Sequence, residues 1–457
     1  MSVASKASND PIASRADLVA ALEGGCKPKN QWRVGTEHEK FVFRSNTHKP
    51  VPHEGENGIG ALLKRLGEKL KAEPMVEAGQ IIGLVVEDGQ GAVSLEPGGQ
   101  FELSGAPLRT LHETCSETHN HLRVLREIAE PMGIKFLGIG VAPTWRIDEV
   151  PLMPKARYRI MTPYMEKVGT LGTSMMRRTC TVQANLDFAS EADMVKKLRV
   201  ALALQPVATA LFANSPFLDG RPSGLLSTRS HIWLNTDPAR TGMLPFAFEA
   251  GMGFERYVDY ALDVPMYFVI RDGKYVNCAG QSFRDFLVGK LPALPGEVPT
   301  KADWDNHLST IFPEVRLKGF LEMRGADCGP WEEICALPAL WTGLLYDEAA
   351  LDGAWQIVRH WTAQERQALH LAVPKTALST PFRKGTVLDI VRQILPLARA
   401  GLQRRDNRNW EDFNEEIHIA PLQVIADSGR TLAERLLDLY HGAWEGELDE
   451  IFEARAY

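Results

Sequence analysis

The chain has 457 residues, of which 44% are hydrophobic and 24% are charged, and its net charge at pH 7 is −7. These values are typical of a globular protein with a large core, and the acidic balance argues against a non-specific nucleic-acid binder, which would be basic. The six cysteines lack the paired spacing of a zinc site, so reduced, buried thiols are expected.

The first 15 residues are small and polar and lack the apolar core of a secretory signal, so they are expected to form a flexible tail. The longest apolar run, residues 200–213, is interrupted by Gln205 and Pro206, and no membrane span is expected. These features together predict a cytoplasmic protein.

After a short helix at residues 17–23, the first predicted strand covers residues 34–43. Alternation along a strand places Glu37 and Glu39 on one face, continuous with Phe41 and Phe43. Two carboxylates on a hydrophobic face must be paired or must coordinate a metal, unless the acidic end of an edge strand lies in water. This segment alone leaves both interpretations open.

A second acidic pair follows a helix at residues 60–72 and a hairpin of residues 81–87 and 92–95 that turns at Asp88-Gly89. The Pro97-Gly98-Gly99 run predicts a turn or bulge that would bring Glu96 and Glu102 to one spot. A long helix at residues 108–132 and a strand at residues 135–141 come next.

Lys155 and Arg157 begin a helix, where they would contact an anion or a nucleotide or form an exposed basic turn. A strand at residues 177–188 carries Gln183 and Asn185 on one face, which is either solvated or the lining of a polar cleft. The helix at residues 191–213 is apolar enough to be buried.

Another strand is predicted to begin at residues 227–233 with Arg229, which would grip a carboxylate or lie on the surface. A helix at residues 254–262 and a strand at residues 266–271, turning at Asp272-Gly273, precede a last strand at residues 315–324 with Glu322 and Arg324 on one face. From Trp331 the pattern is helical.

The order of elements predicts an α+β fold, in which a mainly antiparallel, curved sheet forms a cleft and is backed by helices. Residues 16–457 are expected to form a single domain, with an α+β core at residues 16–330 and a helical layer at residues 331–457.

If the three acidic sites converge, five carboxylates share one cleft, which requires cations. Oxygen ligands without His or Cys partners indicate Mg²⁺, or Mn²⁺ as the alternative, and Mg²⁺ usually bridges phosphate oxygens. The chain has no P-loop, so the predicted site is one for phosphoryl transfer without that motif.

Several blocks closely resemble plant-type glutamate–cysteine ligase, the family of plants and proteobacteria that makes γ-glutamylcysteine. The resemblance runs from about residue 15 to the end, and it implies a glutamine synthetase-like catalytic fold. The glutamine synthetase patterns are matched in order by Glu37-x-Glu39, Glu96-x-x-x-Gln100-x-Glu102 and Glu322-x-Arg324. The blocks that carry the resemblance are 35–41, 95–105, 153–155, 178–183, 213–217, 229–233, 257–268 and 322–327.

The resemblance implies that ATP phosphorylates the γ-carboxylate of glutamate and that the amine of cysteine displaces the phosphate, the first step of glutathione biosynthesis. Under this interpretation the five glutamates Glu37, Glu39, Glu96, Glu102 and Glu322 ligate the metals. Arg324 stabilises the transferring phosphoryl group, Arg229 holds glutamate, and Lys155 and Arg157 lie near nucleotide or substrate. Gln183 and Asn185 line the cleft, and Tyr260 or Tyr267 contacts cysteine.

Ala156 stands where relatives carry Gly, and the early start of the family core predicts a bacterial, cytosolic member. Cys115 and Cys335 lie in blocks that resemble cysteine-bearing plant segments, but free thiols are expected. The chain is expected to be a monomer or homodimer with small-molecule substrates only, without nucleic acid or membrane. Two alternatives remain: a ligase with another amine acceptor, and a non-catalytic amino-acid or nucleotide sensor.

Overall fold

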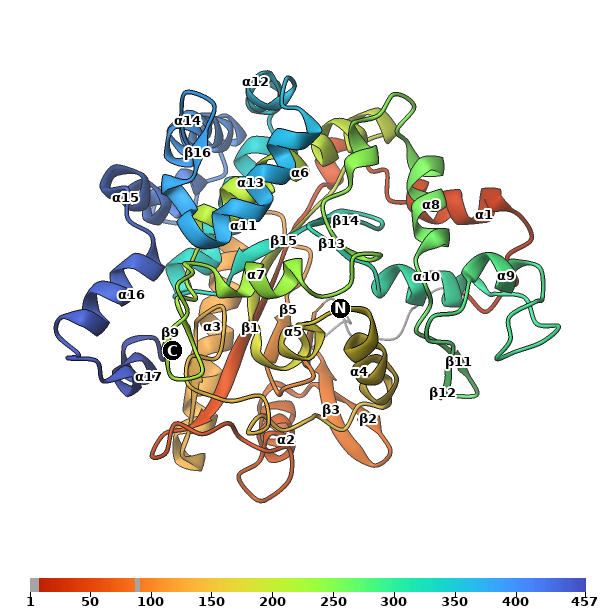
Figure 1. Ribbon diagram of the computed structural model, residues 1–457, viewed down its shortest axis with the longest axis horizontal. Coiled ribbons are helices and arrows are strands. Elements are labelled where there is room, and N and C mark those ends of the chain that lie inside the picture. Colours follow the sequence, from red (N-terminus) through yellow and green to blue (C-terminus); the bar gives the residue numbers. More distant parts are fainter. Residues whose placement is uncertain (1–7, 87–90) are drawn as a thin grey trace.

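A nine-stranded sheet, antiparallel at every pairing, organises the computed structural model, which describes residues 8–86 and 91–457. β1 runs through its middle (Figure 1). In spatial order the strands are β14 (Val315–Leu317), β15 (Leu321–Asp327), β7 (Thr181–Leu186), β1 (Val34–Arg44), β5 (Phe101–Ser104), β4 (Ala92–Leu95), β3 (Gln80–Val85) and β2 (Glu73–Glu77), with β6 (Ile134–Leu137) pairing with the far end of β1.

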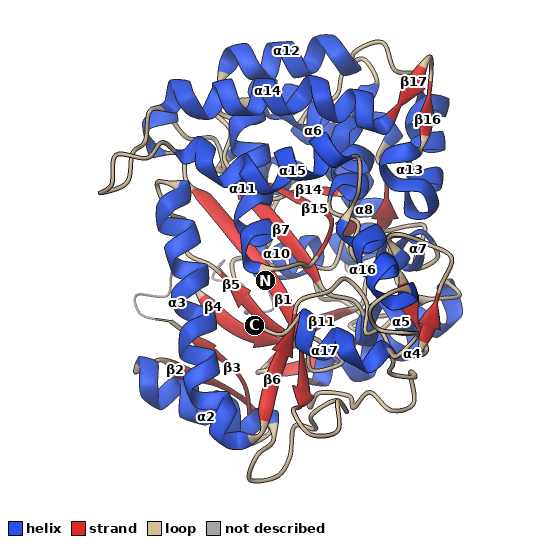
Figure 2. Ribbon diagram, turned by 90° about the vertical axis from the view of Figure 1, so that its left-hand side faces the viewer, coloured by secondary structure: helices blue, strands red, loops and turns tan. Residues whose placement is uncertain are grey.

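One face of the sheet is covered by long helices whose buried side chains complete the core. The helices α3 (Leu111–Ala129), α6 (Glu191–Leu211) and α11 (Trp331–Leu345) contact the central strands, and α2 (Ile59–Leu70) contacts β3. The remaining C-terminal helices follow α11 in the chain. They are α12 (Glu348–Val358), α13 (Ala363–Thr376), α14 (Val387–Arg405), α15 (Ala420–Ser428), α16 (Leu432–His441) and α17 (Ile451–Ala454). In Figure 2 α12 and α14 lie above α11, whereas α17 lies near β6.

The other face is bordered by shorter helices and hairpins that follow or interrupt the sheet strands in the chain. The helices are α4 (Ala156–Val168), α5 (Gly172–Arg178), α7 (Thr228–Leu234), α8 (Phe254–Asp263), α9 (Phe283–Leu287) and α10 (Lys301–Ser309), with α1 (Arg15–Glu23) against α8. The hairpins are β8 (Phe217–Leu218) with β9 (Arg221–Pro222) and β11 (Phe268–Arg271) with β12 (Lys274–Asn277), and a parallel pair joins β10 (Thr241–Gly242) to β13 (Phe312–Pro313). A further hairpin, β16 (Pro381–Phe382) with β17 (Gly385–Thr386), lies between the C-terminal helices.

The predicted α+β class with a mainly antiparallel sheet is confirmed. The turn at Asp272-Gly273 is confirmed as well, because both residues have positive φ and connect β11 to β12. β3 and β4 pair as predicted, but the turn expected at Asp88-Gly89 lies outside the described residues.

Two local predictions were wrong, and one strand was missed. Residues 228–234 form a helix, because Ser227 caps it by accepting a hydrogen bond from the Ser230 amide. The strand expected at residues 315–324 is a hairpin of two strands, β14 and β15. Strand β2, which pairs with β3, was not anticipated.

Within the segment expected to form a tail, Ile12 is buried and its amide donates to the Pro299 carbonyl, while residues 1–7 lie outside the described residues. The expectation of free thiols was wrong for one pair. Cys115 on α3 and Cys335 on α11 form a disulfide that links two helices behind the sheet, and Cys26, Cys180, Cys278 and Cys328 remain free. No helix among the described residues has the length and apolar composition needed to cross a membrane.

Candidate active site

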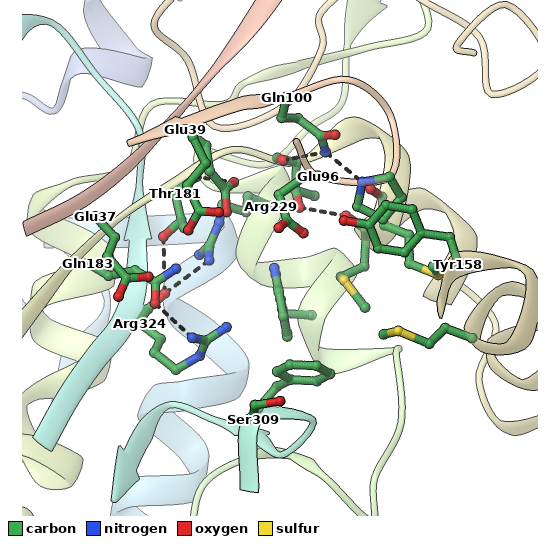
Figure 3. A pocket seen from close by; sticks show the side chains of 18 of the residues that line it. Glu37, Glu39, Glu96, Gln100, Tyr158, Thr181, Gln183, Arg229, Ser309 and Arg324 are labelled. Atoms are coloured by element: carbon green, nitrogen blue, oxygen red, sulfur yellow. Dashed lines mark hydrogen bonds between the residues drawn. The ribbon is translucent and has the colours of Figure 1, made fainter. Parts of the chain in front are cut away.

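A pocket of about 90 Å³ lies on the open face of the sheet, and we call it the sheet pocket. Side chains from β1, β5, β7 and β15 form its floor, and α4, α5 and α7 supply its walls. Its charged lining consists of the carboxylates Glu37, Glu39, Glu96 and Glu102 and the guanidinium groups Arg157, Arg229, Arg316 and Arg324. In Figure 3 side chains of both charges converge on the same space.

The carboxylates meet because of strand register. Glu39 on β1 lies directly opposite Glu102 on β5, and paired residues of antiparallel strands point to the same face. Glu39 accepts a hydrogen bond from the Thr181 amide at 3.0 Å. Glu102 accepts from the Ser94 hydroxyl at 2.6 Å and from the Ser104 hydroxyl at 3.3 Å.

Glu96 joins them through the predicted turn. Gly99 has a φ of 83°, a backbone conformation that side chains disfavour, and a Cβ at Gly98 would lie 2.2 Å from the Arg177 carbonyl oxygen. Gln100 locks the turn by accepting from the Gly98 amide at 2.8 Å and donating to the Thr179 carbonyl at 2.9 Å. The turn therefore needs glycine at both positions and fixes Glu96 beside Glu102.

This arrangement is electrostatically unfavourable. Burial raises the pKa of Glu39 well above its usual range, and the neighbouring Glu96 and Glu102 raise it further. Burial and Glu102 also raise the pKa of Glu96. Neighbouring carboxylates repel one another when all of them are ionised, so this site is suited to a positively charged partner.

The donor set fits a hard divalent cation, because all four groups offer carboxylate oxygens. No group of three His, Cys, Asp or Glu side chains within residues 8–86 and 91–457 is close enough to hold a metal ion by itself. Mg²⁺ is usually bound by one or two carboxylates, with water and phosphate oxygens completing the shell. The carboxylates would fit such a shared site rather than an all-protein cage.

The cationic wall faces the carboxylates from α4, α7, β14 and β15. Arg229 is 3% exposed, donates to the Arg324 carbonyl at 2.9 Å, and its Nε has no partner among the described residues. Arg157 packs its guanidinium over the Phe268 ring at 5.5 Å, and its Nε is likewise without a partner in the described chain. Both arginines therefore retain donors for an anion.

Glu322 is not among the residues that line the sheet pocket, although the sequence placed it with the metal ligands. It is fully buried, and both of its oxygens accept hydrogen bonds from Arg316 at 2.8 Å, with a further short contact to Arg324. Burial opposes ionisation here, but Arg316, Arg324 and Lys318 hold the pKa of Glu322 well below its usual range. In this structure Glu322 therefore fixes the positions of the Arg316 and Arg324 guanidinium groups.

The two polar side chains on β7 are placed differently with respect to the sheet pocket. Gln183 lines the pocket, is 4% exposed and accepts from Arg324 at 2.7 Å. Asn185 is half-buried, does not line the pocket, and donates to Glu37 at 2.9 Å. Gln183 therefore fixes one arginine of the pocket, and Asn185 fixes one of its carboxylates from behind the lining.

Like Glu322 and Asn185, the predicted site residues Lys155, Tyr260 and Tyr267 do not line the sheet pocket. Lys155 is 2% exposed and donates to the Leu95 carbonyl at 2.6 Å, directly before Glu96. Tyr267 packs against Arg240, whose guanidinium lies 3.9 Å from the ring centre. Tyr260 lies on α8 and packs against the rings of Phe246 and Tyr257. Any contact of the tyrosines with substrate would need a rearrangement.

Sequence reasoning missed Arg316, Trp233 and three methionines in the lining, Met161, Met175 and Met176. Arg316 was detectable, because it stands directly opposite Glu322 on the β14–β15 hairpin and opposite charges often face each other across strands. Trp233 would have followed from a helical interpretation of residues 228–234, since it is four residues after Arg229. The methionines carry no spacing signal that separates them from core residues.

Comparison with known proteins gives consistent results. Residues 33–454 match the family described as glutamate–cysteine ligase family 2 (GCS2). A chloroplastic glutamate–cysteine ligase B from Oryza sativa subsp. japonica is 55% identical over 97% of this chain and 87% of its own length. The chloroplastic glutamate–cysteine ligase of Arabidopsis thaliana is 54% identical over 97% of this chain and 83% of its own length.

A distant likeness supports the fold alone. The crystal structure of glutamate–cysteine ligase from Francisella tularensis in complex with AMP aligns with a TM-score of 0.55 at 12% identity, covering 94% of this chain and 88% of that one.

The comparisons contradict the expected cytoplasmic location, since these curated relatives are chloroplastic enzymes. The expectation failed because a compartment was inferred from composition and from the first residues, neither of which determines where a catalytic domain resides. The bacterial source stays a prediction.

Proposed function

Because this chain belongs to glutamate–cysteine ligase family 2, we propose that the sheet pocket is where it joins the γ-carboxylate of L-glutamate to the amine of L-cysteine with consumption of ATP. The product is γ-glutamylcysteine, and the reaction is the first step of glutathione biosynthesis. The observation that carries the assignment to this pocket is its division into a carboxylate wall and a guanidinium wall.

In the first half-reaction a γ-carboxylate oxygen of glutamate attacks the γ-phosphorus of ATP, and ADP leaves. Arg324 would stabilise the charge on the transferring phosphoryl group, because Glu322 and Gln183 hold its guanidinium at the floor of the pocket. Arg229 would hold a carboxylate of glutamate with the donors that the described chain leaves unused. Arg157 would contact substrate or phosphate from the opposite helix.

In the second half-reaction the cysteine amine attacks the acyl carbon of γ-glutamyl phosphate, inorganic phosphate leaves, and the amine gives up a proton. The pocket would serve mainly to position the reactants and exclude water, as in other phosphoryl transfers. Gln183 and Asn185 would line the substrate cleft. Tyr260 and Tyr267 stay candidates for the cysteine subsite only if α8 and β11 move toward the pocket.

Glu37, Glu39, Glu96 and Glu102 would hold Mg²⁺, or Mn²⁺, which when bound neutralises the phosphate charge. We place Glu322 apart from this group, as the residue that positions Arg316 and Arg324. Lys155 would support Glu96 from behind through the Leu95 carbonyl instead of contacting nucleotide directly. The order of the acidic patterns on one antiparallel sheet supports a glutamine synthetase-like catalytic arrangement.

The test is ADP release by the full chain with ATP, glutamate and a panel of amines that includes cysteine and ammonia. Release that depends on cysteine and is fastest with it is the expected result. Release that is independent of cysteine, or fastest with ammonia, would favour a glutamate–amine ligase with another acceptor.

A further inference from the structure

A second cavity, of about 470 Å³, lies between α5, α7 and the β8–β9 hairpin, and we call it the hairpin cavity. Its volume is within the range of small-molecule sites. It shares no lining residue with the sheet pocket. Its polar and charged lining includes Ser174, Arg178, Asp219, Arg221, Thr228 and His231.

Arg178 is the buried charge of this cavity. It is 6% exposed and donates to the Trp145 carbonyl at 3.1 Å, to Ser174 at 3.0 Å and to Asp219 at 2.5 Å. Its Nε has no hydrogen-bond partner among the described residues. Arg178 therefore places a buried positive charge on the wall of the cavity, with Asp219 as its ion-pair partner.

The charge of the cavity is unbalanced. Asp219, at the hairpin tip, is the one acidic side chain of its described lining, against two arginines. Arg221 and His231 are exposed, and neither side chain has a hydrogen bond or ion pair with any residue that the structure describes. Leu171, Leu218, Leu225 and Ile232 form the remaining wall. Cationic groups beside an apolar wall suit an anion with an apolar body.

The two helices that separate the hairpin cavity from the sheet pocket present a different side to each. On α7, Arg229 and Trp233 are four residues apart and line the sheet pocket, whereas Thr228, His231 and Ile232 line the hairpin cavity. On α5, Met175 and Met176 line the sheet pocket, whereas Ser174 and Arg178 line the hairpin cavity. The helices contact each other, with α7 above α5 in Figure 1.

We propose that the hairpin cavity is a second binding site, for a small carboxylate with an apolar body, and that its occupancy changes the affinity of the sheet pocket for glutamate through α5 and α7. Arg221 and Arg178 bind the carboxylate, and the leucine wall holds the apolar body. A ligand that shifts α7 moves Arg229 with it, because both lining sets belong to the same two turns of helix. Such coupling is reciprocal, so glutamate changes the affinity for the carboxylate by the same factor.

The binding test uses 3-phenylpropanoate as probe and 3-phenylpropan-1-ol as its uncharged match, measured by titration calorimetry on the full chain with saturating glutamate. We expect the acid to bind and the alcohol to bind at least tenfold more weakly. In Arg221→Gln the Kd of the acid should rise at least tenfold. Arg359→Gln, an exposed arginine on the far helical layer, is the matched control and should leave the affinity unchanged. If the acid does not bind the wild type, or if Arg221→Gln and Arg359→Gln bind it with the same affinity, the proposed site is wrong.

The coupling test compares the Kd of the acid with and without saturating glutamate and the Kd of glutamate with and without saturating acid, all by titration calorimetry. The two ratios should agree and should differ from one. If the acid binds through Arg221 but its Kd does not depend on glutamate, the proposed coupling is wrong and the proposed binding site stands. The binding measurement does not rest on the proposed function, so its failure and a failure of ligase activity are distinguishable.

Discussion

Glu39 and Glu102 lie directly opposite each other on the neighbouring strands β1 and β5. Like charges directly opposite on neighbouring strands are destabilising. The sheet therefore carries a local instability at the point where the proposed reaction needs negative charge.

Replacement of Glu102 by glutamine should separate stability from activity. Removing one of two opposed carboxylates should raise the free energy of unfolding of the metal-free protein by about 0.5–1 kcal/mol while turnover falls by roughly 10²-fold or more. Thermal unfolding without metal and ADP release with saturating substrates measure the two effects. The exposed Glu23→Gln serves as control, and near-normal turnover in Glu102→Gln would refute the carboxylate role.

Glu322→Gln should have the opposite effect on stability from Glu102→Gln. Its carboxylate is buried between Arg316 and Arg324, and removing one partner of a buried pair typically costs about 3 kcal/mol or more of stability. We expect lower stability and lower kcat with little change in the Mg²⁺ concentration that gives half-maximal activity. A large shift in that Mg²⁺ concentration would show that Glu322 is a metal ligand. Replacement of the exposed Glu332 by glutamine is the control.

Arg229→Ala should chiefly weaken glutamate binding. Loss of a charge-assisted contact of roughly 1.5–3 kcal/mol corresponds to a rise in the KM for glutamate of about 10- to 100-fold. Initial rates at varied glutamate and fixed ATP measure it, with Arg229→Lys as the intermediate case. An unchanged KM for glutamate would show that Arg229 does not hold this substrate.

Lys40, on the back face of β1, should make stability depend on pH. It is fully buried, donates to the Phe101 carbonyl at 3.0 Å and lies 3.1 Å from His121 Nε2, and burial lowers its pKa to about 8. Between this value and the ordinary lysine pKa of about 10.4, the unfolded chain binds a proton that the folded state does not, so the Lys40 contribution becomes more favourable as pH rises.

Lys40→Met should consequently be more stable than the wild type at pH 7, by up to about 3 kcal/mol, with the difference shrinking toward pH 10. Denaturant unfolding at several pH values measures this difference. The exposed Lys64→Met should show no such trend. A stability difference that is constant from pH 7 to 10 would contradict a depressed lysine pKa.

The disulfide between Cys115 and Cys335 spans 220 residues of sequence. Closing a loop of this length restricts the unfolded chain and stabilises the fold by up to about 5 kcal/mol in the chain-entropy model. The double variant Cys115→Ser with Cys335→Ser should unfold at a lower temperature than the oxidised wild type. Reductant should lower the wild-type midpoint and leave that of the variant unchanged; equal midpoints for oxidised and reduced wild type would contradict this.

Patterns that repeat along a strand were predictable from the sequence. The Glu37-x-Glu39 alternation and the glycine-containing turn before Glu102 each specify a side-chain direction by local geometry alone. What failed depended on partners distant in the chain. A strand was predicted to begin at residues 227–233, but Ser227 caps a helix there.

The position of Glu322 could not be predicted from alternation either. Alternation correctly places it on the same face as Arg324, but only the pairing of β14 with β15 shows that Arg316 occupies its oxygens. The disulfide was missed for a similar reason, because nothing local indicates that α3 and α11 pack together.

The volume of the sheet pocket bears on how ligand complexes should be prepared. At about 90 Å³ it is smaller than the several hundred Å³ that a nucleotide and an amino acid occupy together. Binding of both substrates would call for a wider space, and the short helices α5 and α7, which make few connections to the sheet, are the walls best able to move. Crystals grown without ligand should crack or stay empty when soaked in ATP and glutamate, so complexes should be obtained by co-crystallisation.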